Sequence, residues 1–79
     1  MRIVGEIPHP ECKITLLAWN NRYLIKIEQG LLEQTYKVNQ FDIFSEADLL
    51  KLLDSTFISE CLKRFEDMHQ SLVKALDRL

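Results

Sequence analysis

The chemistry-bearing side chains that lie closest together in the sequence are His9, Glu11 and Cys12. A histidine beside a cysteine can activate a thiol nucleophile, and His-x-x-Cys can supply two ligands of a metal ion. Cys12, however, falls on the predicted core side of its strand, where a buried thiol is inert and keeps a high pKa. Because the sequence fixes no second acid or base beside it, we expect no catalytic residue at this turn.

Cys61 and His69 extend the possible zinc ligands to two cysteines and two histidines. Their separation of eight residues corresponds to about 12 Å along a helix, whereas each ligand of a zinc ion lies only about 2.0–2.3 Å from it. A single site that also uses His9 and Cys12 is therefore excluded. No phosphate loop, nucleophile elbow or paired-carboxylate motif is present, and the pattern resembles no known family with any specificity. The sequence predicts no metal site and no cofactor.

Three polar side chains, Gln34, Tyr23 and Tyr36, are predicted on the apolar side of a sheet, where each needs a hydrogen-bond partner. A buried amide without a partner costs about 1–3 kcal/mol. Gln34 therefore either reaches a helix end or a sheet edge, or it lines a small pocket between the sheet and the helices. The pocket would make the chain a small ligand carrier or an enzyme, which is one of three functional hypotheses.

Trp19 and Arg22 are predicted to face each other across two strands on the other side of the sheet. An aromatic ring and an arginine on an open sheet are features that stack single-stranded nucleic acid. One tryptophan is not a platform, however, and three glutamates interrupt the five bases of this face. The pair is explained by a cross-strand cation–π contact. Single-stranded nucleic-acid binding here is the second hypothesis, and an ordinary half-solvated sheet or a protein-contact patch fits the residues better.

The composition limits the class of protein. The chain has 79 residues, a net charge of −2 and 47% apolar residues, with two glycines, two prolines and two cysteines. Interspersed charges argue against a strongly electrostatic partner such as duplex DNA, and no segment approaches the ~18 apolar residues of a membrane span. Two cysteines do not indicate a disulfide-stapled secreted scaffold. We expect one cytoplasmic domain (residues 1–79) with a sheet in residues 1–39 and helices in residues 45–79.

The first half of the chain predicts a four-stranded antiparallel meander. Residues 8–11 contain two prolines and cannot continue a ladder, while Asn20-Asn21 and Gln29-Gly30 suit two-residue hairpin turns. The strands implied by these turns cover about residues 2–7, 12–19, 22–28 and 31–38.

Each turn fixes a register, and the three registers agree on one apolar face. They pair Trp19 with Arg22, Ile27 with Leu32, and Ile7 with Cys12. The predicted core face consists of Ile3, Ile7, Cys12, Ile14, Leu16, Ala18, Tyr23, Ile25, Ile27, Leu32, Tyr36 and Val38.

The second half predicts two helices. Ser45 with Asp48 resembles a capping box, and Phe44 is expected to pack on Leu49 as a hydrophobic staple at the start of a helix over residues 46–53. Three candidate N-caps at residues 54–56 then begin a helix over residues 56–79. Its apolar residues recur at alternating spacings of three and four: Ile58, Cys61, Phe65, Met68, Leu72, Ala75 and Leu79.

The length of the second helix carries the leading functional hypothesis. At 1.5 Å per residue it would span about 36 Å, whereas strands of six or seven residues span about 20–24 Å. The helix must therefore overhang the sheet, although its apolar stripe continues to Leu79. We expect Leu72, Leu76 and Leu79 to face a second copy of the chain. The protein would then be a homodimeric, non-enzymatic adaptor or regulatory module that can also bind another protein.

Overall fold

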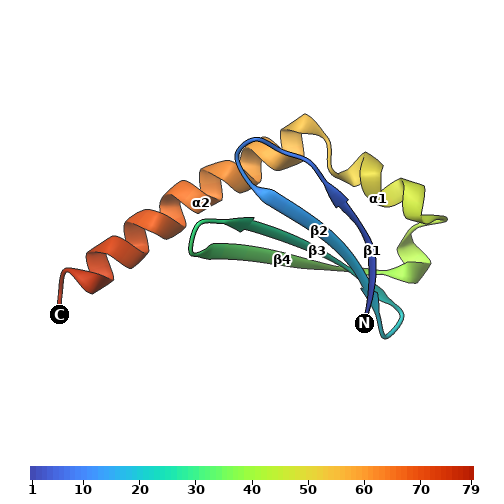
Figure 1. Ribbon diagram of the computed structural model, residues 1–79, viewed down its shortest axis with the longest axis horizontal. Coiled ribbons are helices and arrows are strands. Elements are labelled where there is room, and N and C mark those ends of the chain that lie inside the picture. Colours follow the sequence, from blue (N-terminus) through green and yellow to red (C-terminus); the bar gives the residue numbers. More distant parts are fainter.

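The computed structural model describes all 79 residues, which form a four-stranded antiparallel sheet covered on one face by helices (Figure 1). The predicted α+β fold is confirmed, and every predicted boundary lies within three residues of the observed one. The elements in chain order are β1 (Arg2–Ile7), β2 (Lys13–Trp19), β3 (Arg22–Gln29), β4 (Leu32–Asn39), the 3₁₀ helix η1 (Gln40–Asp42), α1 (Glu46–Leu52) and α2 (Ser55–Leu76).

The core lies between the sheet and the helices, as the alternation of apolar residues predicts. Only 10 of the 79 residues are buried, so the monomer has a thin core, as expected for a chain of this size. The strands and both helices contribute to it. The central cluster consists of Ile14, Leu16, Ile25, Ile27, Leu49, Ile58, Cys61 and Phe65.

The turn between β2 and β3 has the predicted form. Asn20 and Asn21 both have positive φ angles, 54° and 62°, which match a type I′ hairpin turn. The pairing of β2 with β3 follows the predicted register along its full length, from Trp19 opposite Arg22 to Lys13 opposite Glu28.

The turn between β3 and β4 differs from the prediction by one residue. Gly30 and Leu31 form the turn, with φ +59° at Gly30, and Gln29 pairs with Leu32. The predicted pairing of Ile27 with Leu32 is therefore wrong, and Ile27 pairs with Gln34 instead. Each residue of β3 pairs with a residue of β4 two positions further along than predicted. Because this shift is an even number of residues, each side chain keeps its predicted face.

The first hairpin differs from the prediction in two places, its connection and a β-bulge. Ile7 pairs with Ile14 and not with Cys12, and the register shifts between Ile3 and Gly5. The extra residue, Val4, packs against the core. Because a bulge reverses the alternation beyond it, Ile3 pairs with Leu17 on the open face of the sheet and is exposed. The prediction that Ile3 belongs to the core face is wrong.

Each of the two helices has an aspartate near its start that accepts a backbone hydrogen bond. Asp54 is the N-cap of α2 and accepts from the N–H of Phe57 at 2.8 Å. Asp48 in α1 accepts from the N–H of Phe44 at 2.8 Å, while the Ser45 side chain makes no capping bond. The Asp48 carboxylate thus bonds the N–H one residue before the N-cap, and the Ser45 side-chain bond of the predicted capping box is missing. Phe44 is fully exposed, so the predicted hydrophobic staple is wrong.

The molecule is elongated, with dimensions of 46 × 26 × 19 Å. Figure 1 shows why: α2 crosses the sheet and continues past the turn between β3 and β4 to the C-terminus. None of the helices combines the length and the hydrophobicity needed to cross a membrane.

Candidate interaction surface

The C-terminal tail, which we define as residues 69–79, forms an apolar surface outside the monomer core. Phe65, one turn before the tail, is fully buried against the sheet. Leu72 and Leu76 are 39% and 55% exposed, and Leu79 is completely exposed. Since residues at spacings of three and four share one face of a helix, the tail continues the stripe by which α2 packs on the sheet. The tail therefore presents a core-type surface without a sheet beneath it.

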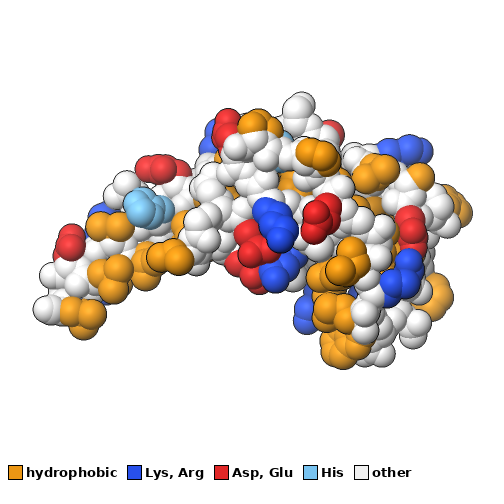
Figure 2. All heavy atoms as spheres, viewed as in Figure 1, with side chains coloured by type: hydrophobic (Ala, Val, Ile, Leu, Met, Phe, Trp, Pro, Cys, Tyr) orange, Lys and Arg blue, Asp and Glu red, His pale blue; other side chains and the backbone are white.

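The tail and the turn between β3 and β4 enclose a groove of about 440 Å³. The turn supplies residues 29–32, in which Leu31 is 97% exposed. On the helix side the groove is lined by Phe65, Glu66, His69, Leu72, Val73 and Leu76. Figure 2 shows the hydrophobic side chains gathered along the protruding part of α2. We call this site the tail groove.

Trp19 and Arg22 lie on the open face of the sheet, away from the tail groove. They pair across the strands as predicted, and Trp19 is 52% exposed. The predicted cation–π contact between Trp19 and Arg22 is not formed. The one aromatic contact in the structure joins Tyr36 to Phe57. A row of Ile3, Leu17 and Leu24 runs beside Trp19 across three strands.

Two of the five bases predicted on the open face are engaged by carboxylates. Lys26 Nζ lies 3.8 Å from a Glu28 oxygen and 3.6 Å from a Glu33 oxygen. Arg2 pairs with Ala18 on the helix-covered face and donates to Glu46 of α1 at 2.8 Å. These contacts reduce the positive charge that the open face offers to a phosphate backbone.

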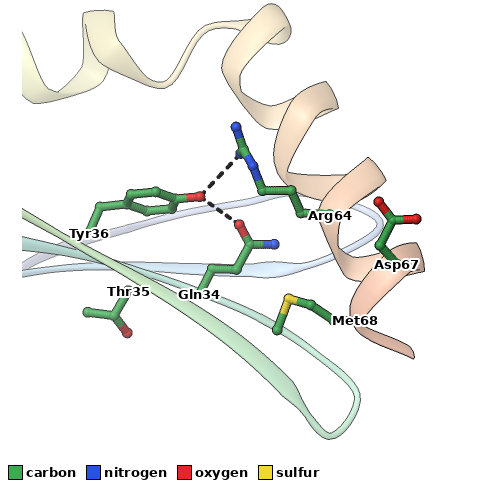
Figure 3. A pocket seen from close by; sticks show the side chains of 6 residues that line it. All are labelled: Gln34, Thr35, Tyr36, Arg64, Asp67 and Met68. Atoms are coloured by element: carbon green, nitrogen blue, oxygen red, sulfur yellow. Dashed lines mark hydrogen bonds between the residues drawn. The ribbon is translucent and has the colours of Figure 1, made fainter. Parts of the chain in front are cut away.

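Gln34 bonds to a carbonyl in the interior of α2, and not to a helix end or a sheet edge as one of the two predicted solutions had it. Its Nε2 donates to the Cys61 carbonyl oxygen at 2.8 Å, and its Oε1 accepts from the Tyr36 hydroxyl at 2.7 Å. Arg64 donates in turn to the Tyr36 oxygen at 3.2 Å (Figure 3). No buried side-chain nitrogen or oxygen is left without a partner. The network joins β4 to α2.

A shallow hollow of about 420 Å³ lies beside this network, lined by Gln34, Thr35, Tyr36, Arg64, Asp67 and Met68 (Figure 3). Tyr23, the third residue of the predicted pocket, does not line it. Burial, and next a contact with the Cys61 thiol, raises the pKa of the Tyr36 hydroxyl above its usual value. The phenol therefore stays protonated and acts as a hydrogen-bond donor.

The turn of His9, Glu11 and Cys12 is held by one hydrogen bond within the turn and one from β3. His9 Nδ1 accepts from the N–H of Glu11 at 3.1 Å, and Gln29 Nε2 donates to the Glu11 carbonyl at 3.1 Å. Burial raises the pKa of the Cys12 thiol, as do the nearby Cys61 and Glu11. No three His, Cys, Asp or Glu side chains come together as a group that could hold a metal ion.

The structure thus brings Leu72 and Leu76 together on the tail groove, with Leu79 three residues further along, and leaves Trp19 and Arg22 on another face. Sequence reasoning missed Leu31 and Val73. Leu31 directly follows the glycine of a predicted hairpin turn. An apolar residue at the tip of a hairpin was the signal that could have indicated its part in this surface. Comparisons with protein-family models, with curated proteins and with solved structures found no match.

Proposed function

We propose that this chain is a homodimeric protein-interaction module that acts as an adaptor or regulatory subunit. The observation that carries the proposal is the C-terminal tail, whose apolar stripe continues the core-facing stripe of α2 beyond the sheet. Burying one leucine side chain completely is worth about 1.5–3 kcal/mol, so Leu72, Leu76 and Leu79 together represent a substantial driving force for association.

Sedimentation equilibrium over a range of concentrations tests the proposal. We expect a species of twice 9.3 kDa that dissociates on dilution. Leu72→Glu with Leu76→Glu should abolish it, because like charges would be forced into an apolar interface. Gln70→Glu with Lys74→Glu is the matched control, since it places two acids at the same spacing on the exposed polar side of the tail.

Two results would count against the module as described. A single 9.3-kDa species at high micromolar concentration rules out the homodimer. A dimer that survives the change at Leu72 and Leu76 must instead use a sheet edge or the face that carries Trp19.

The proposal also includes a cytoplasmic location and a role without catalysis. Free thiols at Cys12 and Cys61 suit a reducing compartment, and the raised pKa of Cys12 suits an unreactive side chain. Mass spectrometry of protein from cells should find two free thiols that are labelled slowly in the folded state. Rapid labelling of Cys12 would instead support a reactive role for its turn.

A further inference from the structure

The tail groove lies on the side of α2 that faces the sheet, next to the turn between β3 and β4. Phe65 packs on the sheet, and Leu72 follows it seven residues later, which returns almost to the same side of a helix. Leu76 lies one turn further along α2, which ends there, and Leu79 follows in the last turn of the chain. The apolar side of the tail therefore points into the space beside the turn between β3 and β4, with which Leu72 and Leu76 line the tail groove. Figure 1 shows α2 running past this turn, and Figure 2 shows hydrophobic side chains along the protruding part. Whatever covers the tail must occupy this space, next to the end of the sheet.

Building on the homodimer proposed above, we propose that the C-terminal tail of a second copy fills this space in antiparallel orientation. A two-fold axis between the tails then makes the contact reciprocal. Each tail lies in the partner's sheet layer, and its Leu79 lies against the partner's turn between β3 and β4. The tail groove of each copy receives the tail of the other copy.

The shape of the monomer selects the antiparallel arrangement. Each copy is two layers thick where α2 covers the sheet, and one layer thick along the tail, where α2 runs alone. In an antiparallel pair, the partner's helix continues the layer of the first sheet, and the partner's sheet continues the layer of the first helix. In a parallel pair, each sheet would have to occupy the position of the partner's α2. Only the antiparallel pair covers both tails without this overlap.

The size of the contact supports including the turn. Eleven tail residues correspond to an overlap of about 16 Å, and specific interfaces usually involve about 20–30 residues on each side. Tail-to-tail contact alone is therefore small. Residues 29–32, with Leu31 almost completely exposed, provide further apolar surface where the partner's Leu79 would end. A contact below the usual size is typical of weak or transient association, so we expect the dimer to dissociate on dilution.

The reciprocal contact between Leu31 and the partner's Leu79 can be tested by exchanging charges. Both side chains are fully exposed in the monomer, so Leu31→Glu and Leu79→Lys leave its core intact. Each variant alone should dimerise at least tenfold more weakly than the wild type. A mixture of the two should form the heterodimer in excess over the statistical proportion, because one end regains two leucines and the other pairs Glu with Lys. Native mass spectrometry of the mixture measures this proportion.

Phe44→Glu is the control, because Phe44 is equally exposed but lies in the connection before α1. It should leave the dimer unchanged. If the wild type dimerises and Leu72→Glu with Leu76→Glu dissociates it, but Leu31→Glu has no effect, the antiparallel arrangement is wrong while the homodimer stands. A statistical mixture of the two charged variants also overturns the reciprocal contact. A monomeric wild type removes the homodimer itself.

Discussion

Gln34 shows how one polar side chain on an apolar strand face can join two elements. It lies opposite Ile27 on the helix-covered face, and both ends of its amide are hydrogen-bonded, to Cys61 and to Tyr36. The need for a partner was predictable, because a buried amide is costly when it has none. Its partner was not, since the position of α2 over β4 depends on the packing of the whole core.

Replacing Tyr36 with phenylalanine should destabilise the fold, because it removes the donor to Gln34 Oε1 and the acceptor of the Arg64 hydrogen bond. We expect the free energy of unfolding to fall by about 1–2 kcal/mol. Tyr23→Phe is the matched control, because no hydrogen bond of the Tyr23 hydroxyl is observed, and it should change the value by less than about 0.5 kcal/mol. Urea unfolding at one protein concentration measures both. Equal losses in the two variants would contradict the network.

Asp48 gives the fold a dependence on acidic pH. The hydrogen bond from the Phe44 N–H, helped by Lys51, holds the pKa of this carboxyl below its ordinary value of 3.8. A carboxylate with a lowered pKa in the folded state stabilises the fold above its unfolded pKa, and this contribution is lost as the pH falls through the folded pKa. Stability should therefore decrease below about pH 4.

In Asp48→Asn, this decrease in the free energy of unfolding should be smaller than in the wild type. The Asp42→Asn control should follow the wild type, because no hydrogen bond or ion pair involves the Asp42 carboxylate. Urea unfolding at pH 6 and at pH 3 makes the comparison. The same loss in the wild type and in Asp48→Asn would show that Asp48 does not contribute.

The sheet was predictable where local turn chemistry determines the register. Asn20 and Asn21 adopt positive φ angles readily, and the hairpin around them was predicted pair by pair. Gly30 can occupy either central position of a two-residue turn, so the sequence left the register uncertain by one step. The bulge beside Gly5 has no local signal beyond the glycine itself. Placing Ile3 on the open face depends on how β1 curves over the core.

The two glycines should respond differently to alanine. Gly30 has φ +59°, where a side chain costs roughly 1–2 kcal/mol, so Gly30→Ala should lower the free energy of unfolding by about that amount. Gly5 has no positive φ, and no atom lies within 4 Å of an added Cβ. Gly5→Ala should therefore be neutral or stabilising by up to about 1 kcal/mol. Thermal and urea unfolding provide the comparison, and a larger loss at Gly5 would contradict the described turn and bulge.

The whole molecule buries only 10 residues and leaves 12 large hydrophobic side chains exposed. The overhang of α2 followed from a length argument, because a helix of that length cannot lie entirely over strands of six to eight residues. The tail groove did not follow from it. The groove needs the turn between β3 and β4 to lie under α2 with Leu31 pointing outward, and this depends on the angle at which α2 crosses the sheet.

Small-angle scattering can test the arrangement of the proposed dimer. The monomer is 46 Å long, and two copies that overlap only through their tails would reach about 75 Å. We expect the maximum dimension to rise towards this value as the concentration increases. The Leu72→Glu, Leu76→Glu variant should stay near the monomer length at all concentrations. A dimer close to 50 Å long would instead indicate two molecules packed side by side.

The bulge in β1 also bears on whether the edges of the sheet can template fibrils. An unpaired edge strand templates further strands when it is long, flat and regular. The bulge between Ile3 and Gly5 bends β1, and Pro8 follows the strand immediately, so this edge is a poor template for cross-β growth. The opposite edge, β4, has no bulge but carries Glu33 and Lys37 on its open side. Stacks of identical strands would bring these like charges together at every step, so amyloid-like growth is opposed at both ends of the sheet.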